Sequence, residues 1–64
     1  MTVNQLNRVE TFENGQWVEQ GHSKDFGNAW EYARMMRREG KRVRILGPAV
    51  TPEGMCYEHC WEIR

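Results

Sequence analysis

The sequence predicts a small α+β domain of the order ββαββ, in which one amphipathic helix packs on one face of an antiparallel sheet. Three observations support this fold class: an Asn-Gly pair between two strand-like runs, a capped helical stripe after them, and alternating apolar residues near the end. With 64 residues, the chain has room for a single domain, residues 1–64, with a thin hydrophobic core. We expect residues 1–6 to form a flexible N-terminus.

The first two strands are predicted on either side of Asn14-Gly15. Both central residues of a type I′ turn have positive φ, which Asn tolerates and Gly adopts freely. The flanking runs, 8–13 and 16–20, are rich in residues that favour strands. A two-residue turn between these runs places Phe12 directly opposite Trp17.

The same register leaves two alternatives for this aromatic pair. Val9, expected opposite Gln20, shares one face of the hairpin with Val18, whereas Phe12 and Trp17 share the other face. If the helix covers the valine face, the two aromatic residues form an exposed patch of the kind found in protein interfaces. If the helix covers the other face, they belong to the core. Phe12 and Trp17 are therefore candidate partner-binding residues.

A helix is predicted over residues 26–39. Asp25, with Ser23 as the alternative, suits the N-cap, and Gly40 suits the position that follows the last turn. The stripe that faces the sheet has helical spacing and comprises Phe26, Ala29, Ala33 and Met36.

The remainder of the chain is predicted to add two strands. Residues 41–46 alternate as a strand does, and residues 47–54 contain the Gly and Pro residues of a loop. Residues 55–63 alternate between apolar and polar side chains, which favours a strand. The run Thr51-Pro52-Glu53 is instead typical of a helix start, so a C-terminal helix is the alternative.

The net charge is zero, but its distribution is uneven. Residues 34–44 contain six cations and a single carboxylate, Glu39, so this stretch has a net charge of +5. The rest of the chain has a net charge of −5. Arginine binds phosphate and carboxylate in a planar, two-pronged geometry, and Trp30 on the neighbouring flank offers a stacking surface. A solvated helix end is the structural alternative. The candidate binding residues of this stretch are Trp30, Arg34, Arg37, Arg38, Arg42 and Arg44.

Two cysteines and two histidines are the candidate metal ligands. In a strand, Cys56 and Cys60 are about 13 Å apart, and His59 points to the opposite face. We therefore predict no metal and no other cofactor, and we expect both cysteines to be reduced thiols. Were the tail helical, the two cysteines would stack on successive turns and form a zinc site with His59 or His22.

Nothing in the sequence predicts catalysis. The adjacent His59 and Cys60 face apart on a strand, and the glycines do not form a phosphate-binding loop. The N-terminus lacks the basic start and apolar run of a signal peptide, and no apolar stretch approaches the about 20 residues of a membrane span. We expect a non-enzymatic, cytoplasmic protein.

The predicted elements follow the order hairpin, capped helix, glycine and strand. After the hairpin, this order is seen in Asp25-Phe26-Gly27-Asn28-Ala29, then Gly40, then Val43-Arg44-Ile45. In this order, residues 8–46 resemble small phage-encoded proteins that inhibit host machinery, such as inhibitors of host RNA polymerase and anti-CRISPR proteins. The resemblance implies stoichiometric binding of a partner without catalysis, and it carries over no functional residue.

Taken together, these features predict a protein-interaction module, of the phage or prophage inhibitor or adaptor type, that binds a host protein. A nucleic-acid-binding module that uses the basic helix end and the following strand is the first alternative. A zinc-stabilised mini-domain is the second. A protein is the expected partner, no membrane is involved, and a homodimer remains open.

Overall fold

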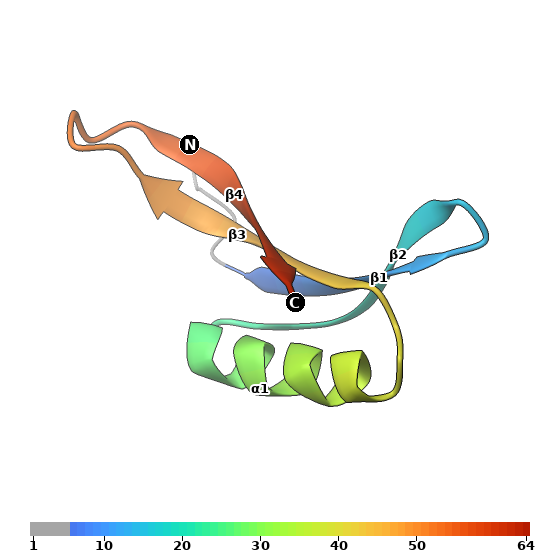
Figure 1. Cartoon of the computed structure of the whole chain (residues 1–64). Coiled ribbons are helices and arrows are strands. Elements are labelled where there is room, and N and C mark those ends of the chain that lie inside the picture. Colours follow the sequence, from blue (N-terminus) through green and yellow to red (C-terminus); the bar gives the residue numbers. More distant parts are fainter. Residues whose placement is uncertain (1–5) are drawn as a thin grey trace.

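The computed structural model describes residues 6–64 and has the predicted order ββαββ (Figure 1). The flexible N-terminus expected at residues 1–6 lies, except for its last residue, outside the described part of the chain. The elements are β1 (Asn7–Glu13), β2 (Gln16–Ser23), α1 (Phe26–Arg38), β3 (Val43–Val50) and β4 (Cys56–Ile63).

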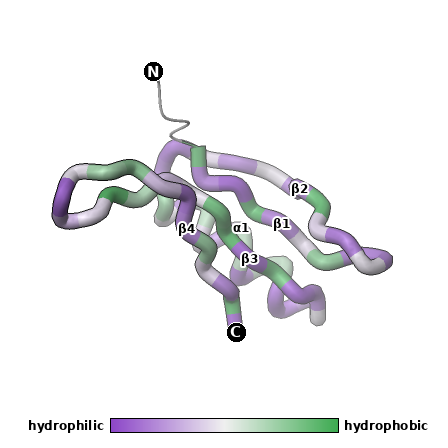
Figure 2. Tube along the Cα trace, turned by 90° about the horizontal axis from the view of Figure 1, so that it is seen from above, coloured by the Kyte–Doolittle hydropathy of each residue, from purple (hydrophilic) through white to green (hydrophobic). Residues whose placement is uncertain are grey.

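The four strands form one antiparallel sheet in the order β2-β1-β3-β4. Two hairpins, β1–β2 and β3–β4, lie side by side, and α1 connects them while it covers one face of the sheet (Figure 1). Viewed from above, the sheet lies in front of the helix, and β2 and β4 are its two edges (Figure 2). No described helix is long and apolar enough to cross a membrane.

The first hairpin has the predicted turn and, near that turn, the predicted register. Asn14 and Gly15 have φ values of 51° and 82°, and Phe12 pairs with Trp17. The expected pairing of Val9 with Gln20 is wrong, because a β-bulge shifts the register and places Val9 opposite Gly21. The bulge adds one residue to β2, which runs on to Ser23 rather than ending at position 20.

Both ends of the helix are capped as predicted. Asp25 is the N-cap, and its Oδ1 accepts a hydrogen bond of 2.9 Å from the Gly27 N–H. Ser23, the alternative cap, instead accepts from the Asp25 N–H. Gly40 has φ 89°, and its N–H donates to the Arg37 carbonyl, so the chain leaves the last turn in the left-handed conformation that glycine favours.

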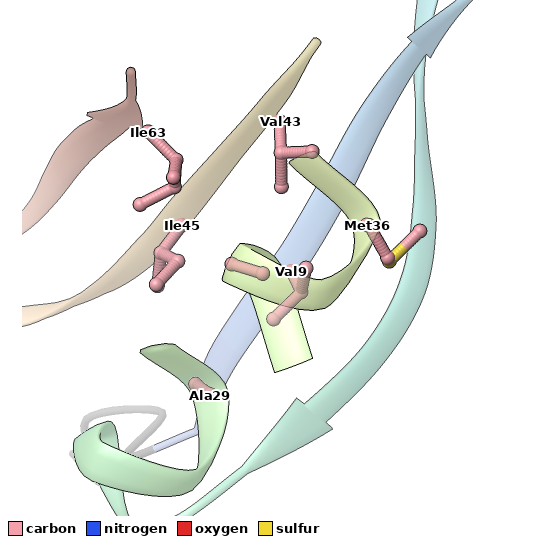
Figure 3. Packing of buried hydrophobic residues seen from close by; sticks show 7 residues of the cluster. Val9, Ala29, Met36, Val43, Ile45 and Ile63 are labelled. Carbon is pink, nitrogen blue, oxygen red and sulfur yellow. The ribbon is translucent and has the colours of Figure 1, made fainter. Parts of the chain in front are cut away.

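The core lies between α1 and the sheet (Figure 3). Three helix residues of the predicted stripe are buried, whereas Phe26, the fourth, is 36% exposed and packs against Trp61 at the rim. Burial of small and branched side chains gives the helix a close approach to the strands. The buried cluster comprises Val9, Ala29, Ala33, Met36, Val43, Ile45 and Ile63.

The prediction of a loop over residues 47–54 is wrong, because β3 continues to Val50 and the turn covers only the last four of these positions. Pro48 fits this strand because the pairing of β3 with β1 ends at Leu46. The missing N–H of Pro48 points to the side that β1 no longer occupies, so no ladder bond is lost.

Residues 56–63 form a strand, which decides the alternative left open for the tail. β4 pairs with β3 over its whole length without a register shift, from Val43↔Ile63 to Val50↔Cys56. The tight turn at Thr51 replaces the helix start that this region resembles: the Thr51 N–H donates to the Met55 carbonyl over 2.9 Å.

Candidate functional site

One face of the sheet has no described element packed on it (Figure 1). Val9, Ile45 and Ile63 point toward α1, so the residues that alternate with them along each strand point the other way. We call this second surface the open face. Near its centre lies one cross-strand row formed by Glu19, Glu10, Arg44 and Glu62.

An aromatic pair and two arginines form a cluster on the open face, beside this row. The ring centroids of Phe12 and Trp17 are 5.2 Å apart in an edge-to-face arrangement. The guanidinium carbon of Arg44 lies 4.2 Å from the centroid of the Trp17 ring. Arg42 lies 5.3 Å from the Phe12 centroid and 5.5 Å from that of Trp17. These four residues are the aromatic–arginine cluster.

The backbone explains why these residues meet. The two-residue turn aligns Phe12 with Trp17, and the Phe12 N–H donates to the Arg42 carbonyl over 3.0 Å, which extends the β1–β3 pairing beyond Val43. Arg44 sits opposite Glu10 in the same ladder. The cluster is therefore positioned by regular sheet geometry rather than by a loop.

Two glutamates hold the arginines in place. The Arg44 Nη2 and Nε atoms lie 2.7 and 2.8 Å from Oε1 of Glu10, and these side chains are only 25% and 11% exposed. Arg42 makes a longer contact of 3.3 Å with Glu62, in which the side chains are 61% and 43% exposed. Arg44 is thus fixed beneath the indole, whereas Arg42 remains accessible to a ligand.

The chemistry that this cluster offers is recognition. A hollow of about 220 Å³ beside it is lined by Trp17, both arginines, Cys60 and Glu62. Ring faces take apolar or cationic groups, and the outer guanidinium takes a carboxylate or a phosphate. Phe12 is 39% exposed, so part of its apolar surface is available as well.

The helix covers the valine face of the first hairpin, so the structure places Phe12 and Trp17 on the exposed side of the two alternatives. Three of the predicted basic residues lie on α1, away from this aromatic pair. Arg34, Arg37 and Arg38 project from exposed positions of α1 and form no ion pair with any residue between 6 and 64.

Trp30 does not stack on an arginine in the described residues. It is 37% exposed, and its ring lies 5.9 Å from that of Phe26. A second gathering of cations occurs where the helix ends: a hollow of about 240 Å³ there is lined by Arg37, Lys41, Arg42 and Arg64, together with Glu62. We call it the basic end.

The candidate metal ligands are not brought together. Cys56 and Cys60 are free and exposed on the open side of β4, and His59 lies on the side that faces α1. His22 belongs to β2, the opposite edge of the sheet. Within residues 6–64, no group of three or more metal-ligating side chains occurs.

Sequence reasoning did not identify one aromatic feature of β4. Tyr57, His59 and Trp61 form a ladder on the helix side, with ring centroids 5.9 and 4.5 Å apart, and Phe26 continues it 4.7 Å from Trp61. The alternation of aromatic residues at every second position was the available signal. A groove of about 570 Å³ adjoins it, lined in part by Phe26, Trp61 and Val50.

Comparisons of the chain with protein-family models, with curated proteins and with solved structures found no match.

Proposed function

We propose that the chain is a non-enzymatic protein-interaction module that binds a partner protein through its open face, around the aromatic–arginine cluster. One observation carries the proposal: Phe12 and Trp17 lie on the face that the helix leaves uncovered, stacked against Arg42 and Arg44. Tryptophan, tyrosine and arginine dominate binding energy at protein interfaces, and such residues cluster where water is excluded on binding.

The cluster is ordered before any partner arrives. Arg44 is fixed by Glu10, and Trp17 rests on Arg44 and on the edge of Phe12. Ordering a flexible side chain on binding costs about 0.5–1.5 kcal/mol. Side chains that are already packed avoid much of that cost, which favours affinity from a small surface.

The same contacts indicate the chemistry of the partner. Among the described residues, the only ion pair of Arg42 is the exposed contact of 3.3 Å with Glu62, so a carboxylate of the partner can bind its remaining N–H donors. An apolar or aromatic side chain fits against Trp17 in the adjoining hollow of about 220 Å³. We therefore expect an acidic partner surface that also presents an apolar side chain. Such a partner would be the target of this chain as a small inhibitor or adaptor.

A binding comparison among three variants tests this function. The immobilised chain is incubated with lysate of its native cell, and the retained proteins are compared for wild type, Trp17→Ala and Arg42→Glu. Trp30→Ala is the matched control, because it removes the same side chain from the helix side. We expect one partner that wild type and Trp30→Ala retain and that both open-face variants lose. Equal retention by wild type and Trp17→Ala would refute the proposal.

The basic end supports nucleic-acid binding as a second candidate function. Arg37, Lys41, Arg42 and Arg64 line its hollow against a single carboxylate. If phosphates bind there, the affinity for a short single strand of DNA or RNA falls steeply with salt, and Arg37→Glu/Lys41→Glu abolishes it. Fluorescence anisotropy with a labelled oligonucleotide at low salt measures both effects. No binding at low salt would eliminate this candidate.

A further inference from the structure

β4 is an edge strand with its outer side unpaired by any described residue (Figure 2). It is eight residues long, pairs with β3 without a bulge, and contains neither proline nor lysine. Natural edge strands are usually short, bulged, or guarded by such residues, because a long regular edge pairs with other strands. β4 therefore lacks a bulge, proline and lysine, and its only charged residues are Glu58 and Glu62.

The other edge differs in this respect. β2 contains the bulge opposite Val9 and Glu10, with Gly21 beside it. A bulge disturbs the spacing of the outward N–H and C=O groups and increases the local twist, so it hinders the addition of a further strand. Addition of a further strand is therefore hindered at the β2 edge and unhindered at the β4 edge.

The hydrogen bonds of the β3–β4 hairpin identify which backbone groups face outward. The Thr51 N–H donates to the Met55 carbonyl, which makes this a hydrogen-bonded pair. Hydrogen-bonded and non-hydrogen-bonded pairs alternate along an antiparallel ladder. Pro48↔Glu58 then falls at a non-bonded pair, which agrees with the missing N–H of proline. The outward N–H and C=O groups of β4 therefore belong to Cys56, Glu58, Cys60 and Glu62.

We propose that a second copy of this chain pairs with β4, antiparallel and strand to strand, about a two-fold axis at His59. The axis is perpendicular to the sheet, so both helices lie on the same side of one continuous sheet. Cys56 and Glu58 then exchange backbone hydrogen bonds with Glu62 and Cys60 of the second copy. The homodimer is isologous, as closed two-fold assemblies are.

Charge selects this register over its neighbours. An axis at Cys60 places Glu58 opposite Glu62 of the second copy, and an axis at Glu58 places that residue opposite itself. Like charges directly opposite each other destabilise a ladder. With the axis at His59, no carboxylate lies directly opposite another, and all residues from Cys56 to Glu62 find a partner within the strands.

Aromatic packing supports the same register. An axis at His59 places Tyr57 opposite Trp61 of the second copy, and the two histidine rings meet at the centre. These residues fall at non-hydrogen-bonded pairs of the new ladder, where side chains approach most closely. In the single chain Tyr57 is 46% exposed, and pairing covers part of that surface with rings. The two aromatic ladders thus become one.

Amide hydrogen exchange measured by NMR tests the pairing directly. The amides of Cys56, Glu58, Cys60 and Glu62 point away from β3 and have no strand partner within residues 6–64, so we expect their protection to rise at least tenfold between about 5 μM and about 500 μM protein. The amides of Tyr57, His59 and Trp61 bond to β3 and serve as internal controls, because their protection already exists in the single chain.

A pair of variants at one position provides the matched control. Glu58→Ala and Glu58→Pro both remove the ion pair with Arg8, but only proline removes the outward N–H. Sedimentation should give twice the 7.6 kDa of the single chain for wild type and Glu58→Ala, and the single-chain mass for Glu58→Pro. Should Glu58→Pro not fold, His59→Lys places two ammonium groups at the axis and is also expected to give single chains.

Three outcomes would overturn the proposal. One is wild type that remains a single chain at about 500 μM, which would leave the edge free for an extended segment of another protein. Another is a dimer in which concentration-dependent protection appears on β2 or α1 instead of β4. The third is a dimer that the proline and lysine variants form as well as wild type does.

Discussion

Replacement of Arg44 by methionine tests how the open face is held together. Arg44 is the only described cation that contacts Glu10, and both of its contacts go to the same carboxylate oxygen. The Glu10 side chain is 11% exposed, so the variant leaves its carboxylate without a cationic partner in a site that water scarcely reaches. Methionine preserves the length and the apolar contact with Trp17, which isolates the loss of charge and hydrogen bonds.

Removing one partner of a buried ion pair costs about 3–5 kcal/mol, because the remaining charge is uncompensated. Arg44 is 25% exposed, so we take the lower end and expect a loss of about 3 kcal/mol for Arg44→Met. A domain of 64 residues has a total stability of about 3–10 kcal/mol. At a slope of about 1 kcal/mol per molar urea, the unfolding midpoint should fall by about 3 M.

Urea unfolding followed by tryptophan fluorescence measures this change, and the chain provides a control. Arg42→Met removes the other cluster arginine, but its ion pair with Glu62 is exposed, so the expected loss is below about 1 kcal/mol. The double variant Glu10→Gln/Arg44→Met no longer contains the unpaired Glu10 carboxylate. We expect that variant to recover most of the stability that Arg44→Met loses.

The reasoning would be refuted if the double variant were no more stable than Arg44→Met alone. The loss would then come from packing or from the guanidinium–indole contact rather than from an unpaired carboxylate. Equal losses for Arg42→Met and Arg44→Met would also refute it, because the difference in burial would then have no energetic consequence.

Three further substitutions test the fold, each by its effect on chemical unfolding. Ile45→Ala should cost about 3 kcal/mol, because the side chain is fully buried between the sheet and α1. Asp25→Ala should cost about 1 kcal/mol through loss of the N-cap bond, with a matching loss of helical circular dichroism. Gly47→Ala should cost about 2 kcal/mol, since its methyl group collides with the Asn7 amide, which donates to two backbone carbonyls. Gly21→Ala, the control, places its methyl group against the ring of Tyr32, which is 39% exposed and makes one long hydrogen bond of 3.3 Å to the Gln20 carbonyl, so it should cost less than Gly47→Ala, about 1 kcal/mol.

The elements that could be predicted from the sequence are those with short-range signals. Asn14-Gly15 specifies its turn by backbone conformation alone, and Asp25 and Gly40 mark the helix ends through hydrogen bonds within a few residues. The bulge in β2 could not be found in this way, because it depends on how Gly21 is paired across the sheet.

The extent of β3 shows the limit of local rules. Gly47 and Pro48 normally interrupt a strand, yet here the first leaves room for the Asn7 amide and the second faces the side where β1 is no longer paired. Both reasons lie in neighbouring strands, distant in sequence. The same holds for the aromatic ladder of β4, which becomes visible only once the helical alternative for the tail is excluded.

All four residues of the aromatic–arginine cluster were candidates from the sequence, but the contacts of the two arginines with the aromatic rings were not predicted. The pairing of Phe12 with Trp17 follows from the turn, but which face the helix covers depends on the packing of the whole domain. The arginines of the basic stretch all fall within residues 34–44, and the chain reverses at Gly40. This reversal leaves Arg34 on the helix and carries Arg44 to the other side of the sheet, against Trp17.

The proposed partner-binding face and the proposed dimer edge are geometrically compatible, because they use different directions of the same sheet. A two-fold axis perpendicular to the sheet leaves both open faces on one side, so the dimer presents two aromatic–arginine clusters to the same partner surface. Edge pairing uses backbone groups of β4 and the ladder that faces α1, and it leaves Trp17 and Arg42 uncovered. When two linked sites bind one target, the second event is intramolecular, and the overall affinity can exceed that of either site by orders of magnitude. A domain of this size, with one small cluster, can in this way reach an affinity that the single chain cannot.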